Sequence, residues 1–363
     1  MSTVNDAKAS LGELFFAGFS GLEMEDSSME FFKKARIGGA ILFTANYENP
    51  GQLAELTNQI QECRDGAPLW ISADQEGGRV QRFKRPFTKI PDARTVGLTD
   101  SPKLAFELAE VCAKELKAVG VNLNFCPVAD INTNPKNPVI GARAYGSTED
   151  QVSKMVTAVV RGHLVQGVQP CVKHFPGHGD TQSDSHFALP KIDTDIDLLR
   201  EREFLPFSKA FKSKCQMVMT AHVLNSKLDP KLPSTLSARA LKEILRKELR
   251  FNGLIISDDM EMKAITEHFE DAPRLALEAG CDILIYRSEA ATRAAYESLI
   301  HSLEAGKLAP EIVLEAAARS RALKKESLRR HEPIVIAQLG SKIGTPVHLA
   351  IASQVEEAAA RNA

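Results

Sequence analysis

Short apolar runs of strand type recur along this chain and alternate about eight times with segments of helical spacing. The runs occupy residues 14–18, 39–43, 69–73, 121–125, 169–172, 217–220, 253–256 and 282–285. Runs that are so short and so uniformly apolar are typical of strands buried on both faces, as in a parallel sheet. The alternation therefore predicts a parallel sheet that is covered by helices.

The segments between these runs carry apolar residues at helical spacing. Leu104, Leu108, Val111 and Leu116 lie on one stripe of the segment 103–119. Similar patterns fill residues 51–63, 150–165, 238–250, 272–280 and 290–305. Parallel βαβ units repeated about eight times predict an α/β fold, a (β/α)8 TIM barrel in a single domain. A doubly wound open sheet is the alternative, but no GxGxxG follows the first strand to favour it.

The barrel accounts for most of the 363 residues. A domain of this class can exceed 250 residues, so we expect residues 1–330 to form one domain. His331, Glu332 and Pro333 then interrupt the helical pattern. Residues 331–363 are predicted to be a C-terminal extension whose second helix runs from about Val347 to Arg361.

Charge and cysteine usage narrow the partners and the compartment. Lys and Arg number 45 against 47 Asp and Glu, so no electrostatic footprint for nucleic acid or an anionic membrane is present. Six scattered cysteines without a close pair indicate reduced, buried thiols. The N-terminus carries Asp6 and Glu13 and lacks a secretory signal pattern, and no apolar stretch reaches membrane-spanning length. We expect a cytoplasmic protein with a small-molecule substrate; the oligomeric state is left open.

Polar and ionisable residues follow five of the apolar runs. They are Asp74, Arg143, Lys173 with His174, His222, and Asp258 with Asp259. In a (β/α)8 barrel these positions ring the mouth at which active sites lie. Charges after strands can also be solvated loop residues, but five strands with such residues favour a site.

The segment 173–186 is the richest in such residues, because it contains three histidines, two aspartates and one lysine. Pro176, Gly177 and Gly179 exclude a regular helix and are typical of a loop. A metal site would need a helix to align His174 and His178 on one face, so no metal is expected.

An Asp two residues before a His occurs at Asp184 and His186. The carboxylate can accept the Nδ1–H of the ring and leave Nε2 as an acid or base, although many such pairs are structural. Beside a barrel mouth, the pair is a candidate proton shuttle.

The strand run that begins at 253 ends in two aspartates. By the two-residue period Leu254, Ile256 and Asp258 share one face, whereas Asp259 shares the other. We therefore expect one aspartate to point toward the barrel axis and its neighbour away. Either could cap the next helix, and the one at the mouth could be a carboxylate nucleophile.

Three sequence blocks resemble glycoside hydrolase family 3. They are KHFPGHGDTQSDSH (173–186), DQEGGRVQRF (74–83), and a signature that runs from Ile244 to Glu248 and, after four residues, continues as GLIISD to Asp258. The block at 74–83 is similar to the single-domain bacterial β-N-acetylglucosaminidases of that family. The similarity covers roughly residues 10–310. One position departs: Glu261 stands where the family signature usually has a small or polar residue.

The resemblance implies a retaining β-N-acetylglucosaminidase on a (β/α)8 barrel, without metal or cofactor. It makes Asp258 the nucleophile and His186 the general acid/base, oriented by Asp184. It assigns the sugar's hydroxyl and acetamido groups to Asp74, Arg82, Arg143, Lys173 and His174. The implied substrate is a muropeptide, GlcNAc linked to 1,6-anhydro-N-acetylmuramic acid, handled in cytoplasmic cell-wall recycling.

Three other interpretations remain open at this point. The first is a β-glucosidase or β-xylosidase of the same family, although such enzymes usually take an acid/base Glu from a second domain for which this chain is too short. The second is a metal-dependent hydrolase on the same barrel, with ligands His174, His178, His186 and Asp258. The third is a sugar-binding protein that has lost turnover.

Overall fold

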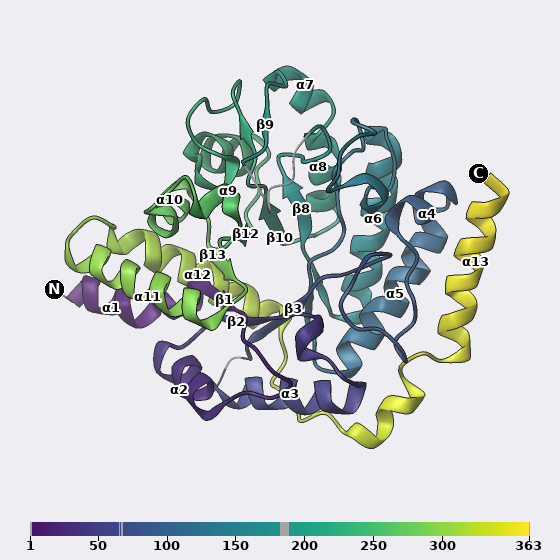
Figure 1. Cartoon of the computed structure of the whole chain (residues 1–363), viewed down its shortest axis with the longest axis horizontal. Coiled ribbons are helices and arrows are strands. Elements are labelled where there is room, and N and C mark those ends of the chain that lie inside the picture. The colour runs from purple at the N-terminus through teal and green to yellow at the C-terminus, as the bar shows by residue number, and fades with distance from the viewer. Residues whose placement is uncertain (1, 65, 67, 182–188, 363) are drawn as a thin grey trace.

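A computed structural model describes residues 2–64, 66, 68–181 and 189–362. Its main sheet consists of parallel strands in the order β7-β6-β3-β2-β1-β13-β12-β10-β8. They are β1 (Phe15–Ala17), β2 (Gly39–Leu42), β3 (Trp70–Ala73), β6 (Leu123–Asn124), β7 (Gln169–Pro170), β8 (Val172–Phe175), β10 (Met217–Thr220), β12 (Leu254–Asp259) and β13 (Ile283–Tyr286). Figure 1 shows the helices arranged around these strands.

The two ends of this sheet are consecutive pieces of one strand. Only Cys171 separates β7 from β8, and its N–H donates to the carbonyls of Asn124 and Cys126 at 2.9 and 3.1 Å. β7 pairs with β6, and β8 pairs with β10, so the sheet closes on itself. Within the described residues the ring has eight strands, and the predicted (β/α)8 barrel is confirmed.

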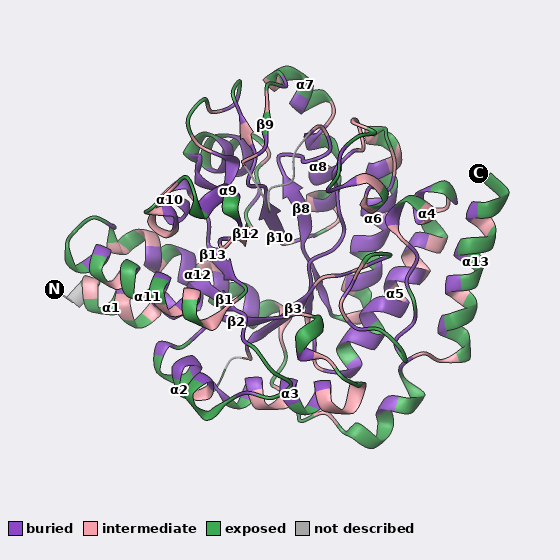
Figure 2. Ribbon diagram, in the orientation of Figure 1, coloured by how far each residue is buried: buried purple, intermediate pink, exposed green. Residues whose placement is uncertain are grey.

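The strand period divides the core into an interior and an outer layer. Leu254 and Ile256 of β12 lie in the barrel interior with Trp70, whereas Ile255 packs outward against the helices. This alternation follows from the two-residue period of a strand. Leu323, near the end of α12 (Pro310–Ser327), packs against the interior cluster. Figure 2 shows the strands buried and the helices exposed on their outward faces.

The predicted helices are found within two residues of their expected bounds. The described helices that cover the barrel are α1 (Ser2–Ser10), α2 (Asp26–Ala35), α3 (Pro50–Glu62), α4 (Ala93–Leu98), α5 (Pro102–Ala118), α6 (Glu149–Gln166), α7 (Ile196–Glu201), α8 (Phe204–Lys212), α9 (Lys263–Thr266), α10 (Ala272–Ala279), α11 (Glu289–Glu304) and α12. The segment predicted at 238–250 is a π-helix, Arg239–Glu248. Side chains that accept from the first turn begin several helices, as Ser101 does for α5 and Thr148 for α6.

Two short pairings at the barrel mouth were not predicted. β4 (Gln75–Gly77) and β5 (Val80–Gln81) form an antiparallel hairpin directly after β3. β9 (Lys191–Ile192) pairs in parallel with β11 (Leu224–Asn225). The hairpin needs glycine at its turn because Gly77 has φ +105° and a Cβ there would lie 2.4 Å from the carbonyl O of Pro91.

The C-terminal segment runs along the outside of the barrel, past α3. After α12 it forms a short 3-10 helix, Ile336–Ser341, and then α13 (Pro346–Asn362), which lies beside α4 and α5 (Figure 1). Glu115 of α5 accepts from the N–H of Gly344 and from Nδ1 of His348, both at 2.8 Å. Among the helices of the described ranges, none has the length and hydropathy to cross a membrane.

Candidate active site

A cavity of about 470 Å³ opens at the carboxyl ends of the barrel strands. Seven residues singled out in the sequence line it: Asp74, Arg143, Lys173, His174, His178, Asp258 and Asp259. Arg82 lines it as well, from the end of the β4–β5 hairpin. The predicted gathering of these side chains at one barrel mouth is therefore confirmed. His222 lies behind this wall, where Nε2 contacts the carbonyl O of Asp259 at 3.0 Å.

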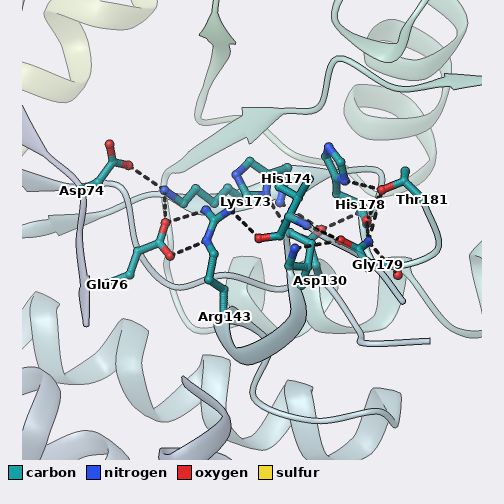
Figure 3. A network of polar contacts seen from close by, with 12 residues as sticks. Asp74, Glu76, Asp130, Arg143, Lys173, His174, His178, Gly179 and Thr181 are labelled. Carbon is teal, nitrogen blue, oxygen red and sulfur yellow. Dashed lines mark hydrogen bonds and ion pairs between the residues drawn. The ribbon is translucent and has the colours of Figure 1, made fainter. Parts of the chain in front are cut away.

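Ion pairs join three of the expected binding residues to one another and to Glu76, a residue that the sequence analysis did not single out. Nζ of Lys173 lies 2.7 Å from Oδ1 of Asp74 and 2.6 Å from Oε1 of Glu76. Arg143 donates to both oxygens of Glu76, at 2.8 Å from Nε and 2.7 Å from Nη2. Figure 3 shows the amine of Lys173 between the two acids, with the guanidinium of Arg143 beside the carboxylate of Glu76.

The network holds its members in their charged forms. Burial alone would raise the pKa of Glu76, but the charges of Arg143 and Lys173 outweigh it and lower that pKa to about 2. The pKa of Asp74 is lowered in the same way, against burial, by Lys173 and Arg82. Burial would lower the pKa of Lys173, but the two carboxylates raise it. The cavity wall is thus lined with fixed charges that can bind hydroxyl groups by charge-assisted hydrogen bonds.

Arg82 is joined to this network through Asp74. Its Nη2 donates to Oδ2 of Asp74 at 2.7 Å, and the guanidinium lies 5.5 Å from the ring centroid of Phe43. Its Nε is buried and has no hydrogen-bond partner within the described part of the chain. A buried donor of this kind costs free energy unless a ligand or water accepts from it.

His174 is oriented by Asp130, the second functional residue that the sequence analysis missed. Nδ1 of His174 lies 2.7 Å from Oδ2 of Asp130, while Oδ1 accepts from the N–H of His178 at 2.7 Å. Burial would raise the pKa of Asp130, but His174 lowers it below its ordinary value. The ionised carboxylate accepts a hydrogen bond from Nδ1 of His174, which keeps a proton on that nitrogen and fixes the orientation of the ring.

Residues 2–64, 66, 68–181 and 189–362 hold no group of three or more His, Cys, Asp or Glu that could bind a metal ion.

Asp258 and Asp259 both line the cavity, so the expectation that they point to opposite sides is wrong. Asp258 follows Leu254 and Ile256 on the interior face, as predicted. The register of β12 against β13 shifts between Ile256 and Asp259, so strict strand alternation does not extend to Asp259.

The two aspartates differ in the direction in which their pKa values are shifted. Burial would raise the pKa of Asp258, but His174 and His222 lower it, so this carboxylate is ionised near neutral pH. Burial raises the pKa of Asp259 to about 6. Asp258 therefore has the properties of a carboxylate nucleophile.

Three positions that the sequence analysis named remain: Asp184, His186 and Glu261. Asp184 and His186 lie outside the described residues. Thr181, which precedes that segment, contacts Nδ1 of His178 through Oγ1 at 2.9 Å. Glu261, the departure from the family signature, accepts from the N–H and Oγ of Ser288 at 2.7 and 2.9 Å. Glu261 thus links the segments that follow β12 and β13.

Residues 7–323 match the sequence model of the glycosyl hydrolase family 3 N-terminal domain. Beta-hexosaminidase A of Pseudoalteromonas piscicida is 35% identical over 360 residues, which cover 91% of this chain and 60% of that protein. This chain therefore spans less than two thirds of that relative. The beta-hexosaminidase of Pseudomonas aeruginosa is 36% identical over 81% of this chain and 86% of its own length.

Solved structures show the same similarity. A glycoside hydrolase family 3 beta-N-acetylglucosaminidase from Paenibacillus superposes with a TM-score of 0.90 at 36% identity, covering 97% of this chain and 68% of the other. NagZ from Neisseria gonorrhoeae, in complex with N-trifluoroacetyl-D-glucosamine, superposes with a TM-score of 0.80 at 28% identity. That comparison covers 95% of this chain and 97% of NagZ.

Proposed function

The chain belongs to glycosyl hydrolase family 3, and from this membership we propose that it is a retaining β-N-acetylhexosaminidase that removes terminal non-reducing GlcNAc. The observation that carries the proposal is the ionised carboxylate of Asp258 at a cavity walled by charged hydrogen-bonding groups. A retaining glycosidase needs such a carboxylate beside the anomeric carbon.

The reaction proceeds in two displacements. The carboxylate of Asp258 attacks the anomeric carbon while His186 protonates the departing oxygen, which leaves a covalent glycosyl-enzyme. His186 then takes a proton from water, and this water releases the sugar with its β configuration retained. The unperturbed pKa of a histidine, about 6.5, suits both transfers near neutral pH. Asp184 orients His186 and stabilises its imidazolium form.

The cavity wall binds the glycone. Asp74, Arg82, Arg143, Lys173 and His174 hold the hydroxyl and acetamido groups of the sugar. Glu76 keeps Arg143 and Lys173 in place through the ion pairs described above. Because these groups already pair with one another, little reorganisation is needed when the sugar binds.

The proposal also covers the natural substrate and the cellular process. We assign the enzyme to GlcNAc-1,6-anhydro-MurNAc muropeptides in cytoplasmic peptidoglycan recycling. The six described cysteines are free and buried, as in proteins of a reducing compartment. Residues 1–330 form the hydrolase domain in this proposal, and residues 331–363 are an extension anchored on it.

The test is the product and its anomeric form. Incubation with a GlcNAc–anhydro-muramyl fragment, followed at once by NMR spectroscopy, should give the β anomer of GlcNAc before mutarotation. Release of the α anomer would exclude retention. Faster cleavage of 4-nitrophenyl β-glucoside than of 4-nitrophenyl β-GlcNAc would favour the β-glucosidase alternative, and loss of activity with a strong chelator would favour a metal-dependent hydrolase.

A further inference from the structure

Asp259, next to the proposed nucleophile, is held at its backbone and at its side chain. Its N–H donates to Oδ1 of Asp258 at 2.8 Å. Its carbonyl O lies 3.0 Å from Nε2 of His222, and its Oδ2 lies 2.9 Å from Nε of Arg287. Two neighbours from distant parts of the chain, His222 and Arg287, therefore hold the residue whose amide contacts the nucleophile.

The ring of His222 is fixed as well. A carbonyl oxygen can only accept, so Nε2 carries a proton and donates it to Asp259. Nδ1 lies 2.8 Å from Oγ1 of Thr235, which in turn lies 2.8 Å from Oγ1 of Thr220. His222 and both threonines are fully buried. This chain of contacts joins the end of β10 to the end of β12.

The contacts make the two oxygens of Asp258 unequal. Oδ1 accepts the N–H of Asp259, whereas no hydrogen bond reaches Oδ2 from any residue that the structure describes. As far as the contacts of the described residues go, the lone pairs of Oδ2 are the ones left for the anomeric carbon. A carboxylate that is fixed through one oxygen also presents the other at a defined angle.

We propose that His222 and Asp259 are positioning residues: His222 holds Asp259 through its carbonyl O, and the N–H of Asp259 engages Oδ1 of Asp258 and leaves Oδ2 as the attacking oxygen. This inference rests on the proposed function, because it specifies how the nucleophile of that reaction is aimed. Oδ2 forms the bond to the anomeric carbon as the bond to the leaving oxygen breaks. The leaving oxygen keeps the electron pair and takes a proton from the general acid. A misplacement of about 1 Å in such a geometry can cost about 100-fold in rate.

Two substitutions of His222 separate positioning from packing. His222→Gln places an amide N–H near the position of Nε2 and can still donate to the carbonyl of Asp259. His222→Asn reaches only the position of Nδ1, so it keeps the contact to Thr235 and loses the one to Asp259. Both remove the aromatic ring, so a purely structural role predicts similar losses for the two.

The readout is the rate at which a 5-fluoro glycosyl fluoride of GlcNAc labels Asp258, measured by mass spectrometry. Fluoride departs without protonation, so this rate reports the nucleophile rather than the general acid. We expect His222→Asn to slow labelling about 100-fold and His222→Gln to recover most of that loss. The dissociation constant of GlcNAc should stay within about 3-fold in both, since the wall residues are untouched.

Arg287→Gln supplies a second arm that does not disturb the core, because the Arg287 side chain is 45% exposed. It frees the carboxylate of Asp259 and should slow labelling about 10-fold. Equal labelling rates in the wild type, His222→Asn and Arg287→Gln would overturn this inference while leaving the glycosidase proposal intact. A wild-type protein that neither releases GlcNAc nor acquires label on Asp258 would instead refute the proposed function.

Discussion

Nζ of Lys173 lies 2.6 Å from Oε1 of Glu76, and the same oxygen lies 2.7 Å from Nη2 of Arg143. One buried carboxylate thus stands between the two cations that are proposed to bind the sugar. The side chain of Glu76 is only 6% exposed. Water therefore screens these pairs weakly, and the position of both cations depends on this acid.

Glu76→Gln should impair both stability and catalysis. Removing one partner of a buried ion pair leaves uncompensated charge, so we expect a loss of about 3 kcal/mol in the free energy of unfolding. We also expect kcat/KM to fall about 100-fold, because Arg143 and Lys173 lose their orientation. Urea denaturation and steady-state kinetics measure the two effects. Glu297→Gln, an exposed position, is the control and should stay within about 0.5 kcal/mol of the wild type.

The same carboxylate predicts an acid dependence of stability. Its pKa in the folded state is about 2, against an ordinary value of 4.5, so below pH 4.5 the unfolded chain binds a proton that the folded chain does not. The contribution of about 3 kcal/mol is therefore complete above about pH 5 and is lost as the pH falls toward 2. The stability advantage of the wild type over Glu76→Gln should shrink by about 2 kcal/mol between pH 7 and pH 3. An advantage that stays constant in urea titrations at both pH values would contradict this assignment.

Asp258→Ala should lower kcat by several orders of magnitude, because no other group then forms the covalent intermediate. Azide can enter the space left by the carboxylate and attack the anomeric carbon from the same side. The expected product with 4-nitrophenyl β-GlcNAc is the α-linked glycosyl azide, which NMR spectroscopy identifies. A variant with near wild-type activity, or a β-linked azide, would show that Asp258 is not the nucleophile.

His186→Ala tests the proton donor that the family resemblance implies. Substrates with good leaving groups need little protonation, so their first step should slow far less than that of substrates with poor leaving groups. A series of aryl β-GlcNAc glycosides with leaving-group pKa values from about 4 to about 10 measures this slope. Equal losses across the series would argue against the role.

Glu115 anchors the C-terminal extension to the barrel. Its carboxylate accepts from Gly344, His348 and both donors of Thr88 at 2.7–2.8 Å. Glu115→Gln turns one acceptor into a donor and should lower the free energy of unfolding by about 2 kcal/mol. Limited proteolysis should then cleave the extension faster than in the wild type. Glu107→Gln, on the same helix with a partly exposed side chain, is the control; equal cleavage rates in Glu115→Gln and the wild type would remove the anchor role.

Periodicity alone was enough to predict the barrel. The two-residue period placed Leu254, Ile256 and Asp258 on one face of a strand, and the structure shows that this face lies at the barrel interior and its mouth. The 3.6-residue period placed those helices that it predicted within two residues of their observed bounds, although it gave no range for others, such as α2 and α8. Both patterns are local, because burial of one face imposes its repeat on neighbouring residues of the same element.

Pairings between distant residues needed the tertiary structure. Glu76 and Arg143 are 67 positions apart, and Asp130 and His174 are 44 apart. No pattern within one element links them, since they meet only through the order in which strands close the ring. The register shift in β12 also depends on its neighbour β13, and it interrupts the alternation between Ile256 and Asp259.

The sequence by itself thus determined the elements, the barrel and the residue types gathered at its mouth. Only the tertiary structure decided which acid partners which base, and it identified Glu76 and Asp130 as members of the site. The physical reason is that the burial pattern of a strand or helix repeats among residues close together in the sequence. The free energy of an ion pair instead depends on distances that exist only once the ring has closed.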